Sequence, residues 1–439
     1  MSGKQVIVVG GGAAGMMAAG RAAEMGAEVV LLEKMEREGK KVLISGNTRC
    51  NLTNSRSLDD FILMYGKNGR FLHTAFRHFF SADLIEMLGK YGIYTSAEQD
   101  GRVFPASGKS ADVVHALTSY MRENGVTTIT RSPVLNIEQA GQGMMAVYTQ
   151  DRTFRTGSVI IATGGASYPQ TGSNGEGYRM AERLGHTIMK LRPSLVPLEV
   201  REKDKVRNLQ GISLKNVRIT SFACSADDIR VRDIPQSDTG RGISGKRARR
   251  PLIESRTGAL VFTHYGISGP AILLMSLAVA DALELGPVSL TIDIVPGKDH
   301  RQLKEELQDE FSRHGSRYVH TILEDLVPSR FAGLLLEAAG IAPDKISNQV
   351  SAAERENIVS RVKDFKFNIS RTRPLAEAMV TAGGVRIEEV NPRAMESKLV
   401  KGLYLCGELL DIDADTGGFN LQAAFSTGYL AGESAARSI

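Results

Sequence analysis

The stretch Val6-Ile-Val-Val-Gly-Gly-Gly-Ala-Ala-Gly15 decides the fold of this chain of 439 residues. Its first four residues are apolar and mostly β-branched, which predicts a buried parallel strand. Three glycines follow at G-x-G-x-x-G spacing, and each has its own task in a dinucleotide site. Gly10 permits a sharp turn, Gly12 lets the backbone approach a pyrophosphate, and Gly15 lets a helix pack closely on the strand.

The residues after these glycines complete a βαβ unit of the kind that binds dinucleotides. An alanine-rich helical run covers Met16 to Met25, and a second apolar strand, Val29 to Leu32, ends at Glu33. The helix N-terminus offers N–H groups and a positive dipole to phosphates, and the acid can accept hydrogen bonds from ribose hydroxyls. The pattern therefore predicts a bound ADP moiety. The residues that we assign to it are Gly10, Gly12, Ala13, Ala14, Gly15, Glu33 and Lys34.

The composition, with 42% hydrophobic and 23% charged residues, is that of an ordinary globular enzyme. The chain is too long for one core, so we expect two or three domains. Three widely spaced cysteines favour a reducing cytoplasm without disulfides, and no Cys/His grouping has metal-ligand spacing. We expect no signal peptide, because the first apolar run leads straight into the glycine motif. The longest apolar stretch, Ala271 to Leu283, is too short to span a membrane.

The charge balance mildly favours a polyanionic partner. The net charge is +5 and the pI is about 9.0. One segment is especially basic, with six cations against one acid, Glu254. Most such loops are merely solvated, and the alternative is contact with a nucleic-acid backbone. The six cations are Arg241, Lys246, Arg247, Arg249, Arg250 and Arg256.

A polar stretch from Ser45 to Asn54 follows a short apolar run, Val42 to Ile44, which we interpret as a strand. The stretch is poor core material, since hydroxyls, amides and Arg49 dominate it. It is either a surface loop with Asx-turns or a cradle for phosphate and the edge of a flavin. Its position just after the strand that ends at Glu33 favours the cradle. The residues that we assign to the cofactor here are Ser45, Gly46, Asn47, Arg49, Cys50 and Asn51.

Two later glycine turns differ in what precedes them. Ser158 to Gly165 is an apolar strand that ends in Thr163-Gly164-Gly165, which either brings a returning strand up to the nucleotide or is an ordinary strand end. The glycine-rich loop Thr171 to Gly177 has no buried strand before it. The sequence therefore predicts one dinucleotide site and no second Rossmann domain.

The predicted secondary structure of the middle of the chain changes twice, first to β-strands and then to helices. Strands near 126–130, 134–137 and 144–149 suggest a small antiparallel sheet. After Pro193 the chain turns β-rich as far as Val295, with one helix that Ser268 can cap and Pro270 can begin. Residues 299–363 are patterned as charged helices. We predict an α/β fold with a discontinuous Rossmann-type FAD-binding domain (1–192 with 374–439), a β-rich insert (193–297 with 365–373) and a small helical insert (298–364).

The C-terminal 65 residues return to the opening domain. A strand ends at Gly407 and Glu408, and Asp415 to Gln422 opens a small-residue helix that runs to Ala436. This is a second helix end directed at an anion, and a nucleotide fold that the far C-terminus completes is typical of FAD enzymes. The residues that we assign to the cofactor here are Gly407, Glu408, Asp411, Gly418, Asn420 and Leu421.

At these motifs the chain resembles, along nearly its whole length, the flavoproteins related to bile-acid-inducible protein N. This family of aminoacetone-oxidase-like FAD enzymes includes a ribosomal RNA dihydrouridine synthase. The resemblance implies adenosine contacts from Glu33 and the backbone of Val134. It also implies flavin contacts from Ser45 to Asn51, Gly407, Glu408 and the Asn420–Leu421 backbone. The matching segments are Gly10 to Gly15, Ser45 to Asn54, Gly101 to Ser107, Ala162 to Gly165, Thr263 to Pro270 and Ala378 to Gly432.

The chain departs from the family in two places. Thr48 stands where the family usually has glycine, which would tighten the loop near the flavin. The segment from Cys224 to Thr257 is longer and more basic than usual. Any substrate inference from that segment belongs to this chain rather than to the family.

Reducing an activated C=C bond requires a hydride and a proton from a general acid. The candidates are Cys50, Tyr168 and His264, with Arg102 as an orienting residue. Each also has a purely structural interpretation. Cys50 would be a small buried hydrophobic residue, and Tyr168 would pack beside Pro169. His264 would cap a helix, and Arg102 would hold a loop in place. Because we predict no second Rossmann domain, NAD(P)H would visit the flavin only transiently.

The leading hypothesis is an FAD-dependent oxidoreductase that reduces uridine to dihydrouridine in 23S ribosomal RNA. A second hypothesis is a small-molecule enone reductase or amine oxidase that uses FAD. A third is a non-catalytic flavin-bearing RNA-binding protein. We infer no metal, no membrane association and no stable protein partner from the sequence.

Overall fold

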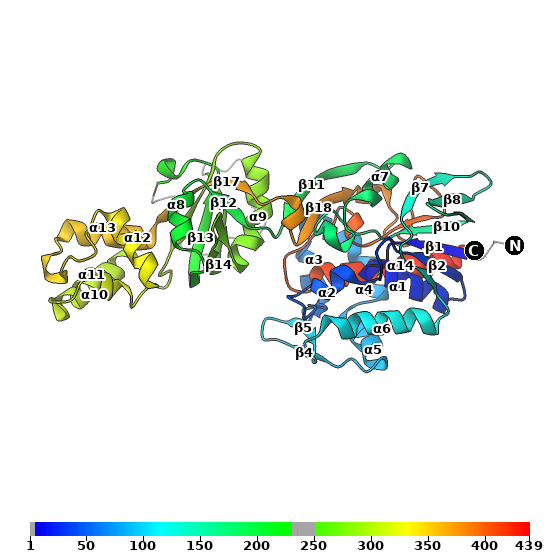
Figure 1. Cartoon of the computed structure of the whole chain (residues 1–439), viewed down its shortest axis with the longest axis horizontal. Coiled ribbons are helices and arrows are strands. Elements are labelled where there is room, and N and C mark those ends of the chain that lie inside the picture. The colour runs from blue at the N-terminus through cyan, green and yellow to red at the C-terminus, as the bar shows by residue number, and fades with distance from the viewer. Residues whose placement is uncertain (1–4, 231–234, 236–250) are drawn as a thin grey trace. The chain divides into compact units, whose positions relative to one another are not determined.

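The computed structural model describes residues 5–230, 235 and 251–439, and it divides the chain into two compact units (Figure 1). The first unit is Met1–Ser194 with Leu375–Ile439, and the second is Leu195–Pro374. The helical insert thus lies within the second unit, and its independence as a domain stays a prediction. Five of the predicted RNA-contacting residues lie outside the described residues: Arg241, Lys246, Arg247, Arg249 and Arg250.

A five-stranded parallel sheet forms the centre of the first unit, in the order β19-β10-β1-β2-β6. Val6 to Val9 in the central strand are at most 3% exposed, because helices cover both faces of such a sheet. The strands are all parallel, so the chain leaves each of them at the same edge. Their bounds are β1 Gln5–Val9, β2 Glu28–Leu32, β6 Thr127–Ile129, β10 Ser158–Ile161 and β19 Leu403–Leu405.

Three long helices lie beside this sheet, and α1 (Ala13–Glu24) packs against both of the others, α6 (Ser110–Glu123) and α14 (Phe419–Arg437) (Figure 1). Glycines set the approach of α14 to α1, since a Cβ at Gly428 or Gly432 would lie 2.3 Å from a carbonyl oxygen of α1. On α1, Gly20 makes room for the Tyr120 ring of α6 in the same way. The last helix of the chain therefore completes the fold that the first forty residues begin.

Two predictions about the first unit are wrong. The segment Val42 to Ile44 is not a strand but part of helix α2 (Lys40–Ile44), which follows the left-handed Gly39. The strand near 126–130 does not join the small antiparallel sheet, because β6 pairs in parallel with β2 at the edge of the main sheet. A strand that follows a crossover helix such as α6 returns parallel to the strand before it.

The rest of the first unit consists of small sheets and short helices around this centre. The sheets are β3-β5-β4, β7-β8-β9 and β11-β18. Their bounds are β3 Thr53–Asn54, β4 Thr95–Ala97, β5 Arg102–Pro105, β7 Val134–Gln139, β8 Met145–Thr149, β9 Thr153–Thr156, β11 Ile188–Ser194 and β18 Val380–Val385. The helices are α3 Leu58–Leu63, η1 Gly66–Leu72, α4 His73–His78, α5 Ser81–Lys90, η2 Pro169–Thr171, α7 Glu176–Arg183, η6 Leu375–Glu377, η7 Ile387–Glu389 and η8 Gly407–Leu409.

The second unit is a closed antiparallel barrel with helices packed on it. The strand order is β12-β15-β14-β13-β16-β17. The strands are β12 Leu198–Val200, β13 Ser213–Phe222, β14 Leu252–Phe262, β15 Gly266–Ser268, β16 Val288–Asp293 and β17 Phe365–Thr372. The helices are α8 Lys203–Asn208, η3 Ala226–Asp228, α9 Pro270–Leu283, α10 His300–Arg313, α11 Val319–Leu323, α12 Ser329–Ala339, η5 Ser347–Gln349 and α13 Ala352–Lys363.

The start of α9 confirms one detail and corrects another. Pro270 is the first residue of the helix, as its fixed φ favours. Ser268 does not cap it, because the cap residue is Gly269 at φ +101° and no side chain caps the helix. A Cβ on Gly269 would lie 2.7 Å from the Ala259 carbonyl oxygen, so glycine is required at this tight crossing.

Within residues 5–230, 235 and 251–439, no helix is long and apolar enough to cross a membrane. The same residues contain no group of three or more His, Cys, Asp or Glu side chains that could hold a metal ion.

A buried histidine of the first unit predicts a pH dependence of stability. His186 contacts Glu389 Oε2 through Nδ1 at 3.2 Å and Ser397 Oγ through Nε2 at 2.8 Å, and its side chain is fully buried. Burial lowers its pKa below 6.5 and outweighs the carboxylate of Glu389, which raises the pKa. As the pH drops below 6.5, the imidazole binds a proton in the unfolded chain before it does so in the folded protein. The contribution of His186 to the free energy of unfolding is therefore complete above pH 6.5 and is lost as the pH falls through the folded-state pKa.

We expect the melting temperature of the parent chain to fall more steeply below about pH 6.5 than that of a His186→Gln variant. Thermal melts of both proteins at a series of pH values measure the difference. Parallel curves for the two proteins would contradict the assignment.

Candidate functional site

The glycine turn after β1 contains two glycines that packing requires and one that faces open space. A Cβ on Gly10, at φ +102°, would lie 2.7 Å from the Ala162 carbonyl oxygen, and one on Gly15 would lie 1.8 Å from the Gly10 oxygen. A Cβ on Gly12 would meet nothing within 4 Å. Gly12 therefore borders a space that the described protein atoms do not fill.

Gly12 is also the cap residue of α1, and no side chain caps this helix. The first turn, which includes Ala13 and Ala14, contains no acidic residue. The first N–H groups of a helix have no partner within it, and together with the helix dipole they favour an anion. The open space beside Gly12 is thus a suitable place for a pyrophosphate.

The carboxylate at the end of β2 holds the glycine turn in place. Glu33 is 9% exposed; the Gly11 N–H donates to its Oε2 at 2.7 Å, and the Met35 N–H donates to its Oε1 at 2.7 Å. The next residue, Lys34, donates to Asn174 Oδ1 and pairs with Glu176, each at 2.7 Å. Its side chain therefore binds the glycine-rich loop of residues 171–177.

The loop of residues 45–51 adopts a strained left-handed path. Gly46, Asn47, Thr48 and Cys50 all have φ between +54° and +65°. Backbone strain of this kind persists where the surroundings hold it in place, and it is common at ligand sites. The Asn51 side chain fastens the end of the loop, since its amide oxygen accepts from the Gly418 N–H at 2.9 Å.

The strain predicts that Thr48→Gly stabilises the protein by about 1 kcal/mol. A residue with a side chain at φ +65° destabilises the folded state by about 1–2 kcal/mol, and Thr48→Gly removes this cost. Glycine offsets part of the gain, about 0.5–1 kcal/mol, because it makes the unfolded chain more flexible. Asn47→Gly is the matched control, because this exposed neighbour has φ +54° but asparagine tolerates that region. Urea unfolding measures both changes. An equal gain in the two variants would show that side-chain strain at Thr48 is not the cause.

The structure places Arg49 and Val134 in different surroundings. Arg49 pairs with Glu98 at 2.6 Å, and its guanidinium lies 3.9 Å from the centre of the Phe104 ring. These partners hold it on the surface of the β3-β5-β4 sheet, and its contact with phosphate stays a prediction. Val134 begins β7 and is 7% exposed.

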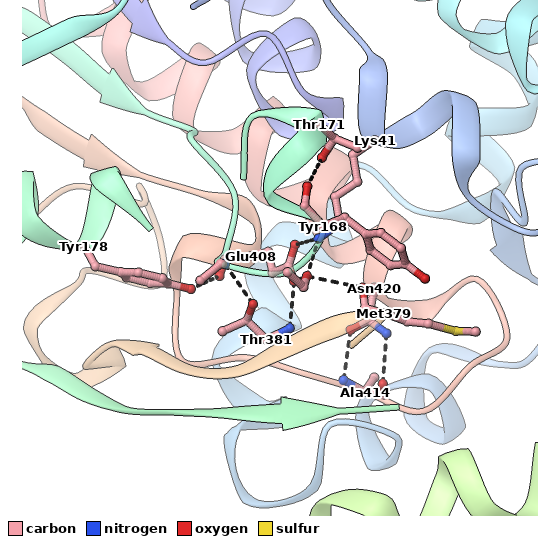
Figure 2. A network of polar contacts seen from close by, with 11 residues as sticks. Lys41, Tyr168, Thr171, Tyr178, Met379, Thr381, Glu408, Ala414 and Asn420 are labelled. Carbon is pink, nitrogen blue, oxygen red and sulfur yellow. Dashed lines mark hydrogen bonds and ion pairs between the residues drawn. The ribbon is translucent and has the colours of Figure 1, made fainter. Parts of the chain in front are cut away.

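Figure 2 shows a polar network that joins α2, β18 and η8, the short helix that follows β19. Glu408 lies at its centre: Lys41 Nζ contacts its Oε2 at 2.6 Å, and the Thr381 N–H donates to its Oε1 at 2.8 Å. Lys41 also contacts Ser167 Oγ at 2.7 Å. Sequence reasoning missed Lys41, since its partner lies 367 positions further along the chain and only the charge complementarity could have suggested the pair.

The second helix end of the site belongs to α14. Its cap residue is Gly418 at φ +90°, where a Cβ would lie 2.3 Å from the Thr53 carbonyl oxygen, and no side chain caps the helix. The Asn420 side chain turns back, accepting from the Ala414 N–H at 2.9 Å and donating to the Ala414 oxygen at 2.8 Å (Figure 2). It shapes the loop before the helix, and the N–H groups of the first turn, which includes Leu421, have no partner within the helix.

Asp411 lies in the same loop region. Burial raises the pKa of its carboxyl group above 3.8, although the Asn68 amide, which donates to Oδ2 at 3.2 Å, lowers it. Asp411 also lies next to η8, which contains Glu408. Contact between Asp411 and the cofactor is a prediction that these surroundings do not test.

The four catalytic candidates lie in four different settings. Cys50 is fully buried, and this burial raises the pKa of its thiol to about 12. Arg102 pairs with Asp100 at 2.7 Å and with Glu98. Tyr168 has a strained φ of +52°, and its N–H donates to the Ala376 oxygen. His264 belongs to the second unit.

The residues of the first unit fit a dinucleotide with a ring system attached. The space at Gly12 would receive the pyrophosphate, and two uncapped helix ends, those of α1 and α14, favour negative charge. Two buried hydroxyls, Thr163 Oγ1 after β10 and Thr53 Oγ1 beside Gly418, have no hydrogen-bond partner among the described residues. Buried polar atoms without a partner are rare in proteins, and a bound ligand would supply the missing partner. Gly164 and Gly407 supply the turns at φ +73° and +72° that lead out of the strands.

Comparison with known proteins gives one family. The family model described as "HI0933-like protein Rossmann domain" matches residues 4–434. The chain is 31% identical to the 3-dehydro-bile acid delta(4,6)-reductase of Clostridium scindens over 98% of both chains. It is also 31% identical to the ribosomal RNA dihydrouridine synthase of Haemophilus influenzae over 96% of both. Among solved structures, a 3-ketosteroid-delta4-(5alpha)-dehydrogenase of Rhodococcus jostii shares the fold, with a TM-score of 0.51, 15% identity and coverage of 99% of this chain and 98% of that one.

Proposed function

This chain belongs to the HI0933-like family of flavin-dependent oxidoreductases, and we propose that it binds FAD and reduces uridine to dihydrouridine in ribosomal RNA. The observation that carries the proposal is the space beside Gly12, which lies at the uncapped start of α1 and follows the carboxyl end of β1, the central strand of the five-stranded parallel sheet. We assign the pyrophosphate of the cofactor to that space, and membership of the family supports a flavin as the rest of the cofactor.

The substrate class rests on what the two relatives have in common. A delta(4,6)-reductase and a dihydrouridine synthase both saturate a C=C bond, and in uridine that bond is conjugated with a carbonyl group. Reducing such a bond needs a hydride and a proton. The net charge of +5 favours the anionic RNA substrate over a neutral small molecule.

The flavin, when bound, supplies the hydride. The residues of this chain bind and orient it. The start of α1 would hold the phosphates, and the start of α14 would stabilise negative charge on a ring placed against it. The pair Lys41–Glu408 fixes the end of β19 relative to α2. NAD(P)H is the reductant that we propose, and it would visit the site transiently.

The candidates for the proton donor differ in their surroundings. A thiol with a pKa of about 12 is a poor donor near neutral pH, which disfavours Cys50. Tyr168 has the strained backbone that is common at active sites. We therefore rank Tyr168 above Cys50 as a proton donor.

The experiment that tests the proposal is mass spectrometry of ribosomal RNA from a strain that lacks the protein. We expect dihydrouridine to disappear at one position of 23S RNA and to return when the purified protein, FAD and NAD(P)H are added. RNA that is unchanged by the deletion would overturn the RNA substrate. Turnover of a small-molecule enone by the same protein would then support the alternative of a small-molecule reductase. Tight RNA binding without any turnover would support the third hypothesis, a non-catalytic flavoprotein.

A further inference from the structure

A cluster of cations and aromatic rings lies on one side of the barrel, where β17, β12 and β15 are neighbours. The strands place Arg371, Glu199 and Gly266 in one row, because Arg371 pairs with Glu199 and Glu199 pairs with Gly266. We call Lys203, Tyr265, His264, Arg371 and Arg373 the barrel patch. All five lie within the second unit.

Three cations of the barrel patch share one buried carboxylate. Glu199 is 2% exposed; its Oε1 contacts Arg373 at 2.7 Å, and its Oε2 contacts Arg371 at 3.0 Å and Lys203 at 3.9 Å. Burial raises the pKa of Glu199, but the hydrogen bonds from the two arginines outweigh burial and lower the pKa below 4.5. All three cations thus contact the same carboxylate, and the Arg371 and Lys203 side chains are 68% and 55% exposed.

Aromatic rings continue the barrel patch. The Arg373 guanidinium lies 4.6 Å from the centre of the Tyr265 ring, within cation–π range. His264 is exposed, and its ring lies edge-on to Tyr265 at 4.7 Å and 78°. A guanidinium stacked on a ring beside an exposed imidazole offers flat surfaces on which a nucleobase can stack.

The nearby acids do not cancel this charge. Helix α8 adds two exposed cations, Lys205 and Arg207, and one exposed acid, Asp204. The other acid in the turn before α8, Glu202, accepts hydrogen bonds from the Asn368 backbone and side-chain amides. These two cations and two acids balance, so the surroundings of the barrel patch add no net charge and leave its excess of cations in place.

We propose that the barrel patch binds single-stranded RNA, with Arg371 and Lys203 on the phosphates and Tyr265 and His264 against the bases. The inference rests on the proposed function only for its choice of RNA as the polyanion. Phosphate contacts supply most of the affinity and make it depend on salt, whereas aromatic stacking tolerates many sequences. The barrel patch holds the RNA, and the chemistry takes place at the flavin.

The test compares two arginines of the second unit that match in exposure and in ion-pair length, one inside the barrel patch and one on α10. Arg371 is 68% exposed with a 3.0 Å ion pair, and Arg313 on α10 is 67% exposed with a 3.0 Å ion pair to Glu310. Fluorescence anisotropy of the full-length protein with a labelled oligouridylate of about 16 nucleotides measures RNA affinity at several salt concentrations. We expect Arg371→Gln to reduce the slope of log K against log salt by about 0.7 and Arg313→Gln to leave the slope unchanged.

A second pair of variants tests the aromatic contact. We expect Tyr265→Leu to weaken RNA binding by about fivefold or more, and Tyr265→Phe to retain the affinity, because phenylalanine keeps the ring. Circular dichroism and thermal melts of each variant separate lost binding from lost folding. An affinity that Arg371→Gln and Tyr265→Leu leave at the level of the parent chain would overturn the proposal.

The outcome is distinct from that of the proposed function. A protein that forms dihydrouridine while its patch variants bind RNA normally would refute the barrel patch alone. A protein that forms no dihydrouridine but loses RNA binding in both patch variants would refute the uridine substrate alone. A patch that binds an acidic peptide, such as oligoglutamate, as tightly as RNA would overturn RNA as its partner.

Discussion

Gly12→Ala should fold as the parent chain does and bind FAD about 100-fold more weakly. The methyl group would meet no protein atom within 4 Å, and Gly12 has φ −83°, which any residue adopts. Alanine is a poorer cap residue than glycine by about 0.5–1 kcal/mol, and it gains a similar amount by restricting the unfolded chain. The stability of the FAD-free protein should therefore change by less than about 1 kcal/mol. The methyl group would instead occupy the space that we assign to the pyrophosphate.

FAD titration by fluorescence quenching, and urea unfolding of the FAD-free protein, measure the two quantities separately. Gly157→Ala is the matched control, since it lies in the same unit and a Cβ there also meets nothing within 4 Å. We expect Gly157→Ala to change neither quantity. If Gly12→Ala bound FAD as tightly as the parent chain, the pyrophosphate would have to lie elsewhere.

The double variant Gly428→Ala/Gly432→Ala should destabilise the first unit by about 3 kcal/mol. Each new Cβ would lie 2.3 Å from a backbone oxygen of α1, that of Ala14 or that of Ala18. Neither oxygen belongs to a flexible side chain, so α14 has to move away from α1. Overpacking costs about 1–3 kcal/mol at each site, and the higher helix propensity of alanine returns only about 1 kcal/mol at each.

Gly89→Ala is the control for helix propensity. Gly89 lies in helix α5, where a Cβ meets nothing within 4 Å, so this substitution should stabilise the protein by about 1 kcal/mol. Urea unfolding monitored by far-ultraviolet circular dichroism gives both values. If the double variant and Gly89→Ala changed the free energy of unfolding by the same small amount, α1 and α14 would not pack closely in solution.

Local sequence was sufficient for the elements that depend on neighbours in the chain. The strand, glycine turn and helix at residues 5–24 were predicted from apolar periodicity and glycine spacing. The resemblance to the flavoprotein family, drawn from the motifs, is confirmed by the family match over residues 4–434. These predictions succeeded because backbone conformation and nearest-neighbour burial determine such features.

Short segments and polar residues were harder to predict. Val42 to Ile44 reads equally well as a strand or a helix, since three apolar residues have no period, and in the folded chain they belong to helix α2, which begins after the left-handed Gly39. The strand Thr127–Ile129 is too short to reveal its partner, and the crossover through α6 placed it beside β2. Arg49 has the right chemistry for a phosphate site, but its partners Glu98 and Phe104 come from a part of the sheet that the motif does not contain.

The sequence by itself determined that this protein has a βαβ glycine turn near its N-terminus, a glycine-led helix at its C-terminal end and membership of a flavoprotein family. Glycine spacing and helix caps depend on residues within about ten positions of one another, so the amino-acid sequence alone reveals them. Only the tertiary structure decided that Lys41 meets Glu408, that glycines of α14 touch α1, and that three cations surround Glu199. Those contacts join residues up to several hundred positions apart, and their strength depends on burial and on distances that folding alone sets.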